Sequence, residues 1–158
     1  MEQCKLELHP RKTRIVYCKD RTQEYPVTKF DFLGYTYKAV YIKCRDGKMR
    51  NNLIASVSTK ACKSLRDKIK ELNLYKMTGS NINIIAEIIN PIVIGWINYF
   101  SKHNSSTIKY TIECIERRLI KWAMCQYKHL RGRRQLSEKW LSEVRIREPK
   151  LFAHWNFR

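Results

Sequence analysis

The sequence is poor in carboxylates. Its 158 residues include only 14 Asp and Glu, against 32 Lys and Arg, and the formal net charge is +18. Self-repulsion at this charge opposes compaction, so the simplest reason to keep it is a polyanionic partner. The balance therefore argues against a free-standing enzyme that acts on small neutral metabolites.

Local patterns of catalytic and metal-binding residues are also missing. None of the four Asp is adjacent to another, the four His lack zinc-type spacing, and the five Gly form no phosphate-binding loop. No local Ser/His/Asp signature is present either. We therefore predict that this chain alone is not an enzyme, and that it has no metal site and no cofactor of its own.

Cysteine pairs and leader-like segments are absent as well. The six Cys are scattered without a C-x-x-C pair, and residues 1–25 carry mixed charges instead of an apolar run. This usage predicts reduced thiols in the cytoplasm or an equivalent organellar matrix, and a protein that is not secreted. The most apolar window, 82–100, is interrupted by polar residues and by Asn90–Pro91, so we expect two buried helices there and no membrane partner.

What the chain does contain predicts an α+β fold. Four Trp, nine Tyr and five Phe supply enough apolar mass for a core. Residues 1–55 have β character, with strands expected at 13–18 and over 30–44, a bend or bulge at Gly34 and a hairpin at Asp46–Gly47. From about residue 56 the apolar period changes from two to 3.6, so 56–158 is predicted to be a mainly helical domain.

The helical part is expected to contain five helices. The first is capped by Ser56 or Ser58 and runs to about Leu74, with Ala61, Leu65, Ile69 and Leu72 on its apolar face. A second covers about 81–89, and Asn90 caps a third with Pro91 at its first position. The last two are predicted at about 106–129 and 136–147.

The strongest positive signal is a basic stretch without acids. Residues 117–137 contain seven Lys and Arg and no Asp or Glu, and aromatic side chains are interleaved among them. Such cations neutralise phosphates, whereas a merely solvated face would mix both signs. Trp122 belongs to the apolar stripe and is predicted to be core. Ile120 and Met124 face away from this stripe and would cover either a neighbouring helix or a partner, and we expect packing on a helix.

Two groups of cations are candidates for phosphate contact. The first consists of Arg117, Arg118, Lys121, Lys128, Arg131, Arg133 and Arg134. The second consists of Lys63, Arg66 and Lys70. For the second group a solvated surface and a phosphate-binding surface remain equal alternatives, because Asp67 and Glu71 lie beside it.

Five segments in the same order resemble the C-terminal part of a group II intron-encoded reverse transcriptase/maturase. Residues 8–17 resemble its NPEKT-R-IVY strand, and 30–35 its FDFLGY motif at the end of the palm. Residues 90–100 resemble the maturase signature NP-x-IRGW-x-NYY, and 122–128 and 151–155 match further islands. Together they extend across nearly the whole chain.

The resemblance implies an architecture and a function. Residues 1–55 would be the end of a reverse-transcriptase palm, and 56–158 the thumb and maturase (X) domain, which binds structured intron RNA to support splicing. Both groups of cations above would then contact RNA. The primer-terminus element would be Phe32, Leu33, Gly34 and Tyr35. The maturase signature would contribute Asn90, Pro91, Gly95, Trp96, Asn98 and Tyr99.

Two departures from the family pattern limit what is expected. The Tyr-x-Asp-Asp metal site of the palm is absent from this chain, so we expect no polymerase site of its own. Ile94 stands where the family usually has Arg, which removes a cationic contact or a buried ion pair.

Two alternatives to a non-catalytic RNA-binding module stay open. In one, the chain is part of a split RNA-directed DNA polymerase, and Mg²⁺ is required only when another chain supplies the palm. In the other it is a general basic ribonucleoprotein component. Residues 1–50 form only part of a sheet, so we expect them to pair with missing palm or fingers segments or to self-associate.

Overall fold

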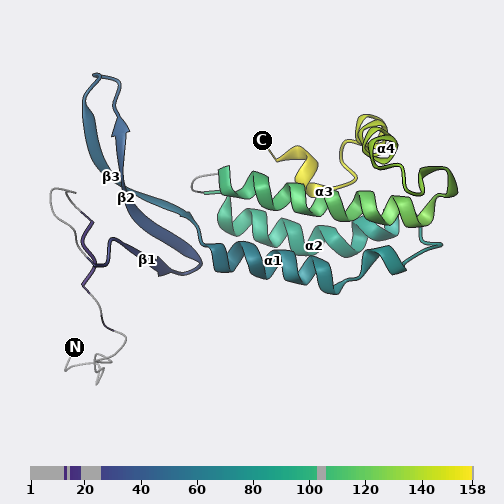
Figure 1. Ribbon diagram of the computed structural model, residues 1–158, viewed down its shortest axis with the longest axis horizontal. Helices are drawn as coiled ribbons and strands as arrows, with labels where there is room; N and C mark the ends of the chain where they lie inside the picture. Colours follow the sequence, from purple (N-terminus) through teal and green to yellow (C-terminus); the bar gives the residue numbers. More distant parts are fainter. Residues whose placement is uncertain (1–12, 14, 19–25, 103–105, 158) are drawn as a thin grey trace. The chain divides into compact units, whose positions relative to one another are not determined.

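The computed structural model describes residues 13, 15–18, 26–102 and 106–157. A short three-stranded antiparallel sheet precedes four helices, which confirms the predicted α+β class (Figure 1). The chain divides into two compact units, residues 1–55 and 56–158. We describe each unit by itself.

The sheet begins with a tight hairpin. Strands β1 (Lys29–Phe32) and β2 (Tyr35–Lys43) are antiparallel, and Phe32 lies opposite Tyr35. Only two residues therefore connect the strands, Leu33 with φ 48° and Gly34 with φ 80°. Positive φ at both turn positions matches the right-handed twist of the strands. The bend or bulge expected at Gly34 is thus a complete reversal of the chain.

A second hairpin joins β2 to β3 (Met49–Val57). Its turn is at Asp46–Gly47, as predicted, and Gly47 has φ 76°. The Cys44 N–H donates to the Lys48 carbonyl at 2.9 Å, and the Gly47 N–H donates to the Cys44 carbonyl at 2.9 Å. The return strand extends over nine residues.

The strand predicted at 13–18 is wrong for the residues described. Residues 13 and 15–18 have no regular secondary structure, although the Tyr17 N–H donates to the Val27 carbonyl at 3.0 Å. β-branched residues favour a strand only when a neighbouring strand completes the ladder. The hydrogen bond from Tyr17 to Val27 is not by itself such a ladder.

The sheet buries few apolar side chains. Tyr35, Ala39 and Val57 are buried, and β1 and β3 are its two edges. Exposed large apolar side chains in this unit include Phe30, Phe32, Leu33, Tyr41, Ile42, Met49 and Leu53. Such exposed apolar surface beside open edges is typical of strands that pair with further chain. The predicted partner for this sheet stays a prediction.

The second unit is a helical bundle. Helices α1 (Thr59–Glu71), α2 (Ile82–Phe100) and α3 (Ser106–Gln126) lie side by side, and α4 (Arg134–Arg147) crosses them steeply near the C-terminal end of α3 (Figure 1). Short 3₁₀ turns connect and follow them. These are η2 (Leu74–Lys76), η3 (Lys128–Leu130) and η4 (Ala153–Asn156).

Helix α1 begins where the sequence predicts. The Ser58 side chain accepts a hydrogen bond from the Ala61 N–H at 3.1 Å, which satisfies one of the free donors of the first turn. Leu65 and Ile69 are buried, whereas Ala61 and Leu72 are only partly buried. Only two of the four positions predicted for the apolar face are therefore fully buried.

The predicted break at Asn90–Pro91 is wrong, because α2 continues through it. The Asn90 side chain does not cap a helix. Its Nδ2 donates to the Leu151 carbonyl at 2.9 Å, and its Oδ1 accepts from the Ala153 N–H at 3.0 Å. Pro91 and Glu87 are both exposed, so the carbonyl that the proline leaves without a donor lies on a solvated face.

Helix α3 supplies the centre of the core. Trp122 is fully buried, as predicted, and its Nε1 donates to the Met77 carbonyl at 3.1 Å. Ile120 is buried and Met124 is partly buried against the core, so both pack as expected. The helix ends at Gln126, three residues before the predicted end, and the Gln126 Oε1 accepts from the Gly79 N–H at 2.6 Å.

Among the described helices, α2 is long and apolar enough to cross a membrane by length and composition. A core helix passes the same test. One side of α2 lies in the core through Ile85, Ala86, Ile89 and Val93, which are at most 3% exposed. The absence of a membrane partner stays an expectation.

Candidate nucleic-acid interface

The exposed side of α3 carries cations one turn apart. Arg117 and Lys121 are exposed, whereas Leu119 and Trp122 between and beside them are buried. Residues four apart lie on the same helix face, roughly 6 Å apart along the axis. Burial of the apolar stripe therefore fixes the direction in which these two charges project.

Aromatic rings hold these cations in place. The guanidinium groups of Arg66 on α1 and Arg117 on α3 lie over the ring of Tyr110, 5.7 Å and 5.8 Å from its centroid. The Lys121 Nζ lies 4.6 Å from the centroid of the Tyr75 ring in η2. These separations are within the range of cation–π attraction, so the cations are partly ordered before any partner arrives.

Arg117 has one further partner. Its Nη2 donates to the Cys114 Sγ at 2.9 Å, one turn earlier on α3. The hydrogen bond to Cys114 raises the pKa of Arg117, and the Tyr110 hydroxyl acts in the same direction. The guanidinium is therefore charged throughout the working pH range.

A groove between α1 and α3, here called the α1–α3 groove, has a volume of about 260 Å³. Leu65, Ile69 and Ile115 give it an apolar lining, and each is 2% exposed. Three arginines also line it: Arg66, Arg117 and Arg118. Among the described residues that line this groove there is no Asp or Glu.

The groove on the other side of α3 is different. This α3–α4 groove, of about 310 Å³, combines arginines with glutamates. Arg134 pairs with Glu138 at 2.9 Å, and Arg145 pairs with Glu116. The predicted contact Arg134 is therefore partly neutralised by a carboxylate just outside the acid-free stretch, and an anion is attracted less strongly here.

A second group of cations lies beyond the end of α3. Lys128, Arg131 and Arg133 are exposed in η3 and in the turn that leads to α4. No ion pair joins them to a carboxylate within residues 26–102 and 106–157. The predicted basic stretch thus consists of a helical part and a turn part.

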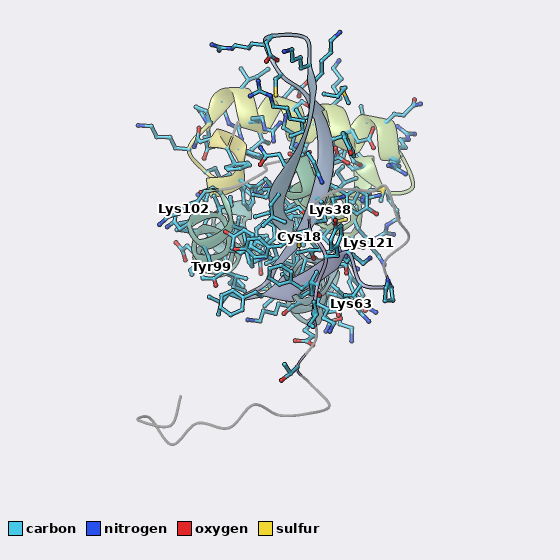
Figure 2. The ribbon with its side chains drawn as sticks, turned by 90° about the vertical axis from the view of Figure 1, so that its left-hand side faces the viewer. Cys18, Lys38, Lys63, Tyr99, Lys102 and Lys121 are labelled. Atoms are coloured by element: carbon cyan, nitrogen blue, oxygen red, sulfur yellow. The ribbon has the colours of Figure 1, made fainter. Side chains whose placement is uncertain are left out.

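The second predicted group, on α1, is also divided. Lys63 and Lys70 are exposed, whereas Arg66 is half-buried and turns toward α3 through Tyr110. Figure 2 shows Lys63 and Lys121 on the same side of the helical unit, with Tyr99 and Lys102 on the opposite side. We call the surface of α1, η2 and α3 that carries Arg66, Arg117, Arg118 and Lys121 the basic face.

The maturase signature lies on α2 and has two sides. Asn90 and Trp96 are partly buried, and the Trp96 ring packs on Phe100 with centroids 5.1 Å apart. Exposed positions of the signature are Pro91, Gly95, Asn98 and Tyr99. A Cβ built on Gly95 meets no atom within 4 Å, so packing within the described chain does not require glycine there.

The departure at Ile94 affects the surface. Its side chain is 45% exposed on α2, so an Arg at this position would lie in solvent. The missing residue is therefore a surface cation and not half of a buried ion pair.

The predicted primer-terminus element belongs to the first unit. Phe32 and Leu33 are exposed, 58% and 65%, Gly34 completes the turn, and Tyr35 is buried. The element therefore presents a turn with two exposed apolar side chains. Its role at a primer stays a prediction.

Three contributions were missed in the sequence. Tyr110 precedes Arg117 by seven residues, two helical turns, so its place on the same face was readable from the spacing. For Tyr75 the sequence gives no such signal, because η2 and α3 are distant in the sequence and come together only in the folded structure. His154 is buried in η4 with its Nε2 4.0 Å from a Glu116 carboxylate oxygen, and burial, with Arg145 nearby, lowers its pKa to about 4.

Among the residues that the structure describes, no group of three or more His, Cys, Asp or Glu side chains is close enough to hold a metal ion.

The chain matches a known protein family. The family described as "Group II intron, maturase-specific domain" matches residues 62–140. This region includes most of α1, all of α2 and α3, and the first half of α4. Neither the curated proteins nor the solved structures contain a match.

Proposed function

Because the chain belongs to the family of group II intron maturase-specific domains, we propose that it binds structured intron RNA and supports splicing. In this proposal the chain acts as a maturase-type module without a polymerase active site of its own. Its RNA contacts are the basic face, the turn cations Lys128, Arg131 and Arg133, and the exposed lysines of α1.

The observation that carries the proposal is the concentration of cations around α3. Arg66, Arg117 and Arg118 line one groove that has no acidic residue in its described lining. Folded domains ordinarily disperse like charges, because bringing them together costs Coulomb energy. A polyphosphate backbone removes this cost and releases its counterions.

The test is binding to a group II intron RNA over a salt series. Each neutralised phosphate contributes about −0.7 to −0.9 to the slope of log K against log salt, so we expect a slope of several units. A flat plot would contradict the proposal. Replacing Arg131 and Arg133 with Ala is expected to weaken binding and to flatten the slope.

A second candidate function is supported by the sheet. Phe32, Leu33 and Met49 are more than half exposed, as expected for strands that complete another chain's palm. In that case the chain would be part of a split RNA-directed DNA polymerase. The test is to mix it with a chain that carries a Tyr-x-Asp-Asp palm: DNA synthesis that needs both chains would support this candidate.

A further inference from the structure

We propose that the α1–α3 groove is a site for one unpaired nucleotide of the bound RNA. The base would enter the groove, and the adjoining phosphates would lie on Arg66, Arg117 and Arg118. This inference rests on the proposed function and adds to it a chemical class of ligand at a defined place.

The charge distribution points to the phosphate part of the nucleotide. The two grooves that flank α3 have similar volumes, about 260 and 310 Å³. In the α3–α4 groove, Arg134 and Arg145 have carboxylate partners. Arg117 lines both grooves, but in the α1–α3 groove it lies with Arg66 and Arg118 and with no carboxylate in the described lining. An anion therefore gains most in the α1–α3 groove.

The lining of the groove points to the base. Leu65, Ile69 and Ile115, each 2% exposed, lie at the bottom of the groove, and Cys114 and the apolar stems of the arginines also line it, a lining that a phosphate alone would not use. Its volume is slightly below the roughly 300–1,000 Å³ of small-molecule sites, which suits a single flat ring system. Bases inside a duplex are stacked and cannot enter, so the ligand is an unpaired nucleotide.

The arginines at the mouth of the groove are positioned in advance. Tyr110 lies under the guanidinium groups of both Arg66 and Arg117, and the Cys114 Sγ accepts a hydrogen bond from Arg117. Guanidinium planes are surfaces on which RNA bases stack. Less side-chain freedom is therefore lost when the nucleotide binds.

The first test compares two RNA hairpins that differ by one base. One contains a single bulged uridine, and the other has an abasic residue at that position, so their phosphates are identical. We expect the wild-type chain to bind the bulged uridine RNA about tenfold more tightly, because only that hairpin has a base that can enter the groove and stack on a guanidinium plane. Equal affinity for the two hairpins would overturn the proposal.

Two cysteine variants locate the effect. Cys114 lines the groove, so Cys114→Phe fills it and is expected to remove the preference for the hairpin with the base. Cys125 is also half-buried on α3, eleven residues or about three turns later, and is not among the residues that line the groove. Cys125→Phe should keep the preference, and its loss in both variants would contradict the assignment to this groove.

A second measurement needs no variant. The rate of Cys114 alkylation by N-ethylmaleimide, read by mass spectrometry at saturating RNA, should fall with the bulged uridine hairpin and much less with the abasic one. Equal protection of Cys114 by both hairpins would overturn the proposal for the α1–α3 groove. The proposed function would still hold if the chain bound intron RNA with an affinity that falls with salt. If the chain bound neither of the hairpins nor the intron RNA, the proposed function would be refuted as well.

Discussion

Gly95 provides a direct test of whether the exposed side of α2 is free of packing within the chain. Its position in the middle of α2 is exposed, its φ is not positive, and a Cβ there would meet no atom within 4 Å. Glycine inside a helix costs about 0.8–1.0 kcal/mol relative to alanine. An added Cβ would clash with nothing here, so replacing the glycine removes this cost. Gly95→Ala is therefore expected to stabilise the helical unit by about that amount, or roughly 4–8 °C in Tm.

The assay is thermal or denaturant unfolding followed by tryptophan fluorescence. All four Trp lie in residues 56–158, so the signal reports on the helical unit alone. Gly132→Ala is the matched control, because its surroundings are equally open but its φ is 72°. That variant should lose about 1 kcal/mol. A loss of stability in Gly95→Ala would refute the description of this face as free of packing within the chain.

Three further predictions concern α2, η4 and the turn cations. Asn90→Ala removes both hydrogen bonds to residues 151 and 153 and should destabilise the helical unit by about 1–3 kcal/mol in denaturant unfolding. His154 has a pKa of about 4 in the folded chain and 6.5 in the unfolded chain. Above pH 7 it is neutral in both states and does not change the free energy of unfolding, but as the pH falls from 6.5 towards 4 only the unfolded chain takes up the proton, so the folded state loses stability. The loss should reach about 3 kcal/mol and be absent from His154→Phe, and parallel pH curves for the two proteins would contradict it. Among the turn cations, Arg131→Ala with Arg133→Ala should weaken RNA binding more per residue than Arg134→Ala, because Glu138 already partly neutralises Arg134; equal effects in filter binding would argue against this ranking.

Features that depend on neighbouring residues could be predicted from the sequence. The Ser58 cap, the hairpin at Asp46–Gly47 and the buried face around Trp122 follow from turn chemistry and from the 3.6-residue period. Each is decided within a few residues of chain. The α+β class and the change of period near residue 56 follow for the same reason.

Features that depend on distant residues could not be predicted from the sequence. Asn90 followed by Pro91 has the local pattern of a helix start, but its side chain is satisfied by residues about 60 positions later, so the helix continues. The strand expected at 13–18 depended on a partner that local propensity does not specify.

The candidate site was predicted in part. The exposed direction of Arg117 and Lys121 followed from the helical stripe, whereas the pairing of Arg134 required looking four residues further, to Glu138, the first residue beyond the acid-free stretch. The contact of Arg66 with α3 through Tyr110 depends on the packing of two helices about 50 residues apart. No local pattern contains that information.

The central claim is tested most directly by a competition between two RNAs. The chain is bound to a labelled group II intron RNA at physiological salt, and either the unlabelled intron RNA or an unrelated structured RNA of equal length is added. Both competitors carry the same charge, so electrostatic attraction alone cannot separate them. The account predicts that the unrelated RNA competes at least about tenfold less well. Equal competition would contradict it and would indicate a general basic ribonucleoprotein component.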